Sequence, residues 1–223
     1  MKIADISIHS ITNPFDKMSE MQRYFALIFA GLFSAMSFAP IYFFPSYMIA
    51  LPVLLVLSAK SQGPRQAFFY GYLFGFGHFF SGLYWIGNSF AVEPSLPDWA
   101  GYIMVACLNL YLSLFPGLAS WGLKIIHKTQ SIKTHLLNMI VSFCILWSVT
   151  EWLRGYLFTG FPWNLSGYIW GFSDIMLQST AIWGTFTLGL IILMISFVPM
   201  LMLEQRYRIF APLLSVALII VLY

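Results

Sequence analysis

The chain is divided into long apolar runs by short turns that carry nearly all of its charge. Hydrophobic residues make up 60% of the 223 residues, and charged residues only 9%. A soluble domain averages about half apolar and about a quarter charged residues, and a chain of this length always leaves much of its surface facing its surroundings. The natural solvent for so apolar a surface is a lipid bilayer. The pattern therefore excludes a soluble enzyme, a disordered chain and a disulfide scaffold.

The apolar runs predict an all-α fold, a polytopic transmembrane helix bundle with six full spans and a truncated seventh. The six predicted spans are 24–44, 46–59, 67–90, 99–125, 136–153 and 175–203. The seventh begins at Ile209, and the chain ends inside it, without the polar flank that anchors a helix at the interface. Residues 1–22 lack the apolar core of a signal peptide, so they are predicted to form a cytoplasmic tail, with the bundle over 23–223.

Basic residues predict the orientation of this bundle. If every span crosses the membrane, ten of the eleven Lys and Arg residues fall on the side of the amino terminus, and only Arg154 falls on the other. Loops rich in Lys and Arg stay in the cytoplasm, so we expect a cytoplasmic amino terminus. The net charge of +3 is small and scattered, whereas a nucleic-acid footprint is a clustered basic face. No nucleic-acid partner is predicted.

The cysteines and histidines predict neither a reactive thiol nor a metal site. Cys107 and Cys144 lie inside apolar runs, whereas a reactive thiolate needs an electropositive, partly exposed setting. The four histidines form no spaced pair with a cysteine or an acid of the kind that binds metals. His78 lies in the middle of the third predicted span, where either a hydrogen bond to a neighbouring helix or a functional role accounts for it. The sequence predicts no metal and no cofactor.

One stretch near the outer end of the fifth predicted span combines charges with a broken helix. Glu151 and Arg154 are three residues apart, so they share a helix face and can pair. Ionisable groups at this depth mark a functional site or a salt bridge that anchors the helix end, and both interpretations stay open. Gly160 and Pro162 then stop the helix. Residues 155–173 are therefore predicted to form an aromatic loop on the outer face.

A second stretch, in the third predicted span, is rich in glycine and aromatic residues. Gly71 and Gly75 are four residues apart, a spacing that lets two helices approach closely. Tyr84 and Trp85 are predicted to reach the outer interface at the level of Trp163. The two stretches together predict one aromatic surface at the outer leaflet.

These stretches resemble the membrane region of bacterial apolipoprotein N-acyltransferases. The resemblance runs from about Gly31 to about Trp183, and its motifs are Phe38-Ala-Pro40, Gly71-Tyr-Leu-Phe-Gly-Phe-Gly-His-Phe-Phe-Ser-Gly-Leu-Tyr-Trp85, Glu151-Trp-Leu-Arg154 and Thr159-Gly-Phe-Pro-Trp163-Asn. It implies an enzyme of lipoprotein biosynthesis in the bacterial inner membrane. Such an enzyme passes an acyl chain from a phospholipid to the amino group of a diacylglyceryl-cysteine. In the family, a cysteine thioester carries the acyl chain, aided by a Glu and a Lys, in a nitrilase-like domain on the outer face.

That domain follows the seventh span in the family, so we expect it to be missing here and the chain to be inactive alone. No catalytic residue is assigned, and a separate nitrilase-like chain is a possible partner, beside membrane lipids, phospholipid and diacylglyceryl lipoprotein. The resemblance implies a lipid-facing role, in which side chains position an acyl chain or headgroup. The residues assigned to substrate binding are Trp163, Asn164, Glu151, Arg154, Trp85 and Tyr84.

Two other interpretations stay open. The unfinished seventh span favours a non-functional truncated fragment without a stable fold. A small multi-spanning transporter would have intramembrane carboxylates, broken helices and internal repeats. The interior offers only His78, Glu151 and Arg154, and the two halves show no convincing repeat, so the transporter is the weaker alternative.

Overall fold

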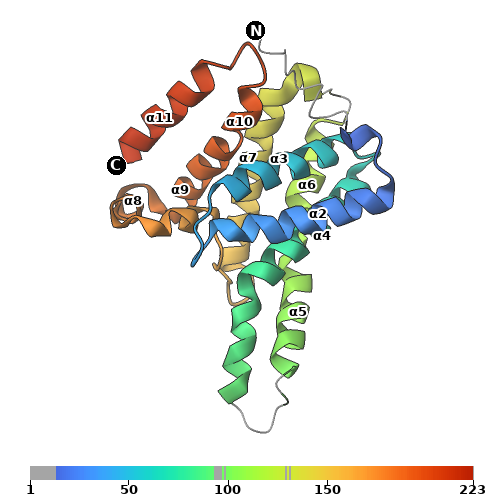
Figure 1. Ribbon diagram of the computed structural model, residues 1–223, viewed down its shortest axis with the longest axis vertical. Coiled ribbons are helices and arrows are strands. Elements are labelled where there is room, and N and C mark those ends of the chain that lie inside the picture. The colour runs from blue at the N-terminus through green and yellow to red at the C-terminus, as the bar shows by residue number, and fades with distance from the viewer. Residues whose placement is uncertain (1–13, 93–96, 98, 129, 131, 223) are drawn as a thin grey trace, which may run out of the picture.

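The computed structural model describes residues 14–92, 97, 99–128, 130 and 132–222, and over these residues it is all-helical, without a strand (Figure 1). The longer helices are α2 (Glu20–Ser34), α3 (Pro45–Lys60), α4 (Pro64–Leu83), α5 (Ala100–Leu112), α6 (Leu114–Ile126), α7 (Ile132–Tyr156), α9 (Thr180–Ser196) and α11 (Phe210–Leu222). The shorter helices are η1 (Ala35–Ser37), η2 (Tyr84–Val92), η3 (Ser166–Phe172), α8 (Asp174–Gln178) and α10 (Val198–Leu201). The predicted all-α class is confirmed. Most of the predicted tail, residues 1–13 of 1–22, lies outside the described residues.

Within the described residues, three helical stretches are long and apolar enough to cross a membrane, namely Ala100–Ile126, His135–Tyr156 and Thr180–Leu201. Pro45–Lys60 and Phe210–Ile220 are apolar but shorter. Each of these five stretches overlaps one predicted span. Most of their ends agree with the predicted ends to within a few residues. The exact number of crossings, six with a seventh begun, stays a prediction.

Several predicted spans are divided where the backbone changes course. The helix of the first span ends at Ser34, about ten residues early, and the chain passes through η1 and an irregular segment before α3 begins at Pro45. The fourth is divided at Ser113, within a turn of Pro116, whose ring displaces the carbonyl four residues earlier. In the sixth, Gly184 has a φ of +74°, a conformation that glycine adopts readily.

Glycines bring α4 into close contact with α2 and α6. A Cβ atom at Gly71 would overlap the Pro116 carbonyl oxygen of α6, and one at Gly31 of α2 would overlap the Phe74 carbonyl oxygen of α4. Small residues allow helix backbones to approach in this way. The close contact predicted for Gly71 is confirmed, and it places α4 between its two neighbours.

The two ends of the bundle differ in shape. At one end, η2 and α5 continue past the other helices as a projecting arm, seen at the bottom of Figure 1. At the other end, α11 stands apart from α9 and joins the bundle through a turn after α10. Near the start of α2 and the end of α3 there are polar contacts, in which the Lys60 amine lies 2.6 Å from Asp16 and the Arg23 guanidinium lies 2.9 Å from Glu20.

Candidate functional site

Arg154, near the end of α7, clamps the loop that follows it. The side chain is 1% exposed. Its Nη1 donates to the carbonyl oxygens of Phe161 (2.9 Å) and Trp163 (2.5 Å), and its Nη2 to that of Asn164 (3.5 Å). Its Cζ also lies 4.9 Å from the centre of the Phe79 ring, a cation–π contact with α4. One buried guanidinium therefore satisfies three loop carbonyls that would otherwise lack partners in an apolar setting.

Glu151, one turn earlier on α7, holds the start of η3. Its Oε1 accepts hydrogen bonds from the backbone N–H of Ser166 (2.9 Å), from the Ser166 hydroxyl (2.8 Å) and from the Trp147 indole (3.1 Å). The Tyr47 hydroxyl of α3 lies 3.0 Å from the Ser166 hydroxyl oxygen. Because the Ser166 proton is engaged by Glu151, Tyr47 is the donor of this bond. The carboxylate thus joins α3, α7 and η3.

The ion pair that the spacing of Glu151 and Arg154 allows is not formed. Both side chains are described, and neither of the two ion pairs found among the described residues joins them. Instead the two side chains bind different parts of the same returning segment. The loop turns back over the end of α7, so its carbonyls reach the guanidinium first, and the Ser166 donors reach the carboxylate. Their shared function is to hold the loop.

The predicted loop 155–173 is more ordered than its sequence suggests. Helix α7 continues to Tyr156, and η3 occupies 166–172, so the irregular part is 157–165. Gly160 has a φ of +74°, and the Phe161 N–H returns to the Arg154 carbonyl oxygen at 2.9 Å. The outcome is a compact turn with its backbone tied to the helix end.

Asn164 serves this turn through its backbone and its size. Its φ of +51° lies in the left-handed region, where asparagine is one of the few side chains found often. Its buried side-chain nitrogen has no partner among the described residues. A Cβ at Gly82 would overlap that nitrogen, so the amide packs directly against α4.

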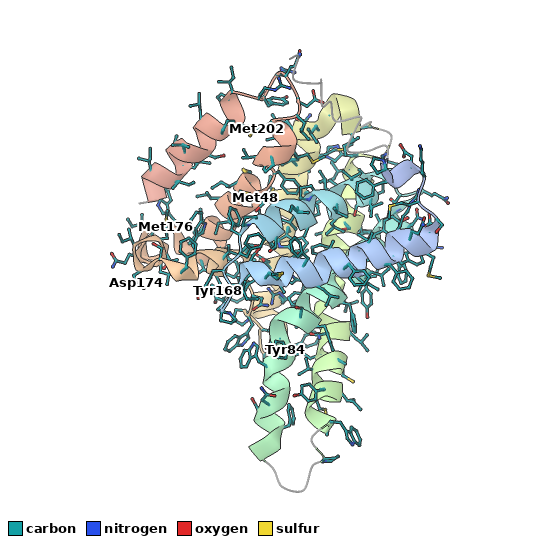
Figure 2. All side chains as sticks on the ribbon, in the orientation of Figure 1. Met48, Tyr84, Tyr168, Asp174, Met176 and Met202 are labelled. Carbon is teal, nitrogen blue, oxygen red and sulfur yellow. The ribbon has the colours of Figure 1, made fainter. Side chains whose placement is uncertain are left out.

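The two aromatic stretches meet, as predicted. The Trp85 ring at the start of η2 lies 5.5 Å from the Trp163 ring between centroids, in an edge-to-face arrangement. Trp163 is 49% exposed and Trp85 43%. Tyr84 is also exposed, and Figure 2 shows it where the arm leaves the bundle. We call Tyr84, Trp85 and Trp163 the aromatic surface. It lies over the turn that Arg154 holds.

His78 forms a hydrogen bond to a neighbouring helix, which is one of the two interpretations of its position in the sequence. Its Nδ1 lies 2.7 Å from the Ser34 hydroxyl of α2. Its ring is buried and packs against neighbouring rings, with Phe79 at 4.9 Å and Phe38 at 5.5 Å between centroids. The hydrogen bond to a neighbouring helix is therefore confirmed.

Sequence reasoning missed four residues that complete this site, Tyr47, Phe79, Trp147 and Ser166. Trp147 lies four residues before Glu151, a helical spacing that would have revealed it. Tyr47 is separated from Ser166 by 119 positions, and no local pattern links them. Among the described residues no group of three His, Cys, Asp or Glu side chains is placed to hold a metal.

The bundle, its long apolar helices and the buried clamp define a helical membrane protein. The chain belongs to the family of the apolipoprotein N-acyltransferase N-terminal domain, which matches residues 30–198. Among its relatives is the apolipoprotein N-acyltransferase of Rickettsia prowazekii, 37% identical over 166 residues that cover 74% of this chain and 32% of the relative. The enzyme of the same name from Shewanella oneidensis is 34% identical over 202 residues, 91% of this chain and 38% of the relative. The chain spans about a third of the length of these curated relatives.

Proposed function

We propose that this chain is the membrane part of an apolipoprotein N-acyltransferase and that its aromatic surface binds the acyl chains of phospholipid and diacylglyceryl lipoprotein. The observation that carries this proposal is the Arg154 clamp. A buried guanidinium satisfies three carbonyls of one turn and so fixes Trp163, half exposed, against Trp85. The membership of the family supports it, because the relatives bear the name of an enzyme that acylates lipoproteins.

The proposed binding mode follows from the chemistry of the aromatic surface. Indole and phenol rings prefer the level of the lipid headgroups, because they offer an apolar body and a polar edge. Rings held in a fixed position lose less conformational freedom when an acyl chain packs on them. We assign Trp163, Trp85 and Tyr84 to direct lipid contact. Glu151, Arg154 and Asn164 act as positioning residues, since they are engaged with the turn itself.

We assign the acyl-transfer step to catalytic groups outside the described residues, because neither cysteine suits it. Cys144 is buried in the main hydrophobic core, and Cys107 lies on the apolar helix α5. Neither lies in the polar setting that a nucleophilic thiolate needs. The proposal is therefore that transfer requires a nitrilase-like domain with its Glu, Lys and Cys, whether on the same chain or on a separate one. The 223 residues alone should bind lipid without transferring an acyl group.

The proposed location is the bacterial inner membrane, with the amino terminus and the basic turns in the cytoplasm. A cysteine introduced by Gly63→Cys, in a chain with Cys107→Ala and Cys144→Ala, tests this orientation. A membrane-impermeant thiol reagent should label it only after the inner membrane is opened. Labelling in intact spheroplasts would reverse the proposed orientation.

The binding proposal is tested with the purified chain in nanodiscs and a diacylglyceryl-cysteine peptide that carries a photoreactive acyl chain. Cross-links should map to the aromatic surface, and Trp163→Ala should weaken binding about tenfold. Trp121→Ala is the matched control, because Trp121 is 43% exposed on α6, away from this surface. Equal losses in both variants, or cross-links spread over the bundle, would contradict the proposal. An increase in peptide mass from acyl transfer would refute only the claim that the chain is inactive alone.

A further inference from the structure

We propose a second lipid site at the opposite end of the bundle, where the chain binds one zwitterionic phospholipid with a primary ammonium headgroup, of the phosphatidylethanolamine type. The headgroup occupies a polar pocket between the start of α7 and the turn after α10. One acyl chain lies in an apolar groove between α7 and α11. This site goes beyond the proposed function and does not depend on it, because it shares no residue with the aromatic surface or the clamp.

The polar pocket has a volume of about 300 Å³. One wall is the first turn of α7, where His135 departs from helical geometry (φ −128°) and Asn138 follows it. The other wall is the turn after α10, which contributes Glu204 and Arg206. The pocket thus brings hydrogen-bond donors, one permanent cation and one carboxylate around the same space.

The apolar groove continues from this pocket. The two share Leu137 and Tyr207 as lining residues, so the groove and the pocket adjoin. The groove has a volume of about 110 Å³, and its far wall is formed by α11 side chains such as Leu214 and Leu218. Figure 1 shows α11 diverging from α9 after the turn that follows α10.

A phospholipid matches a polar pocket beside an apolar groove, because it joins a polar headgroup to acyl chains. The Arg206 guanidinium, whose Cζ lies 5.6 Å from the centre of the Tyr207 ring, is exposed and suits a phosphate. Glu204 on the same wall would repel a purely anionic headgroup, but it complements an ammonium group. Free phosphate would leave both Glu204 and the apolar groove without a partner, so the combination selects a zwitterionic lipid.

The site lies far from the aromatic surface. The membrane-crossing part of α7 runs from His135 to Tyr156 over 22 residues, which is about 33 Å at 1.5 Å per residue. That length matches the hydrocarbon core of a bilayer, about 30 Å. In Figure 2, Met202 marks the turn beside the pocket, and Tyr84 marks the opposite end. A lipid here belongs to the other leaflet.

The test uses the whole 223-residue chain in nanodiscs that contain phosphatidylcholine and a small share of a photoreactive phosphatidylethanolamine labelled on an acyl chain. Cross-links should concentrate in peptides of α7 (137–141) and α11 (210–218). The same probe with a phosphatidylglycerol headgroup should give several-fold fewer. Equal yields for the two headgroups would overturn the zwitterionic assignment, and cross-links absent from α7 and α11 would overturn the site. Cross-links would also be absent from α7 and α11 if a protein segment, and not a lipid, filled the groove.

Variants then separate the two charges. Arg206→Ala should lower the cross-linking yield about tenfold, and Arg65→Ala is the matched control, because Arg65 is an exposed arginine at the start of α4 and does not line the pocket. Glu204→Gln should leave total yield nearly unchanged but abolish the preference for phosphatidylethanolamine over phosphatidylglycerol. Equal effects of the two arginine variants, or an unchanged preference in Glu204→Gln, would overturn the proposal. Because the headgroup comparison uses the unmodified chain, it holds even if a variant fails to fold.

Discussion

Ser166 donates both its backbone N–H and its hydroxyl to one oxygen of Glu151, at 2.9 and 2.8 Å. These two hydrogen bonds from one serine to one carboxylate oxygen fix the first residue of η3 against the end of α7. The turn between them, residues 157–165, is thereby attached at its start to α7 and at its end to Glu151. Arg154 donates hydrogen bonds to three carbonyl oxygens within the turn. The clamp and the aromatic surface therefore depend on a few buried polar groups, and their removal has separable consequences.

Substitution of Glu151 should cost stability in proportion to the donors that it leaves unpaired. Glu151→Gln keeps an oxygen that accepts from Ser166 and Trp147, so we expect a loss of about 1 kcal/mol in the free energy of unfolding. Glu151→Ala leaves three buried donors without an acceptor, and each such group costs about 1–3 kcal/mol, so we expect about 3 kcal/mol or more. Reversible unfolding by SDS in mixed micelles measures both values.

The control for the glutamate series is Ser148→Ala. The Ser148 hydroxyl, on the same helix, is buried and has no partner among the described residues. Its removal should change the free energy of unfolding by less than about 0.5 kcal/mol. If Ser148→Ala lowered the free energy of unfolding as much as Glu151→Ala, the loss would reflect a general sensitivity of α7. The hydrogen bonds of Glu151 would then make no particular contribution.

Arg154→Lys should free the turn without unfolding the bundle. A lysine ammonium is a single point donor and does not reproduce the fork that reaches the carbonyls of Phe161, Trp163 and Asn164. Hydrogen exchange of the 157–165 backbone should therefore accelerate at least tenfold, while peptides of α3 and α4 stay protected. Arg208→Lys, in the turn after α10, serves as the control and should leave the 157–165 exchange unchanged. Unaltered exchange in Arg154→Lys would mean that Glu151 alone holds the turn.

Tyr47→Phe tests the link between α3 and the clamp. The substitution keeps the buried ring and removes only the hydroxyl that bonds to Ser166, so the expected loss is about 0.5–1.5 kcal/mol of unfolding free energy. Tyr156→Phe is the comparison, because that ring is exposed and its hydroxyl has no partner among the described residues. Identical unfolding curves for the two variants would show that the bond to Ser166 contributes nothing.

The sequence predicted those features that depend on local spacing or composition. Residues 46–59 were expected as an apolar helix, and α3 covers Pro45–Lys60, because composition alone marks such a run. The meeting of Trp85 with Trp163 followed from placing both at one membrane level. The bond between Tyr47 and Ser166 joins residues 119 positions apart, so its prediction needs the packing of three helices. The separate partners of Glu151 and Arg154 depend on the path of the turn, which no spacing reveals.

Gly71→Ala tests whether the backbone contact between α4 and α6 determines the stability of the bundle. The added Cβ would overlap the Pro116 carbonyl oxygen and the Ser120 side chain, and neither a proline backbone nor a packed helix moves aside easily. Overpacking of this kind costs about 1–3 kcal/mol or more. Gly63→Ala is the matched control, because nothing lies within 4 Å of a Cβ at Gly63 and its φ of −172° suits any residue. In unfolding by SDS, Gly71→Ala should lower the free energy of unfolding by about 1–3 kcal/mol, while Gly63→Ala stays within about 0.5 kcal/mol of the parent. If the two variants unfold together, α4 and α6 do not pack backbone to backbone, and the position of the clamp above them is not set by this contact.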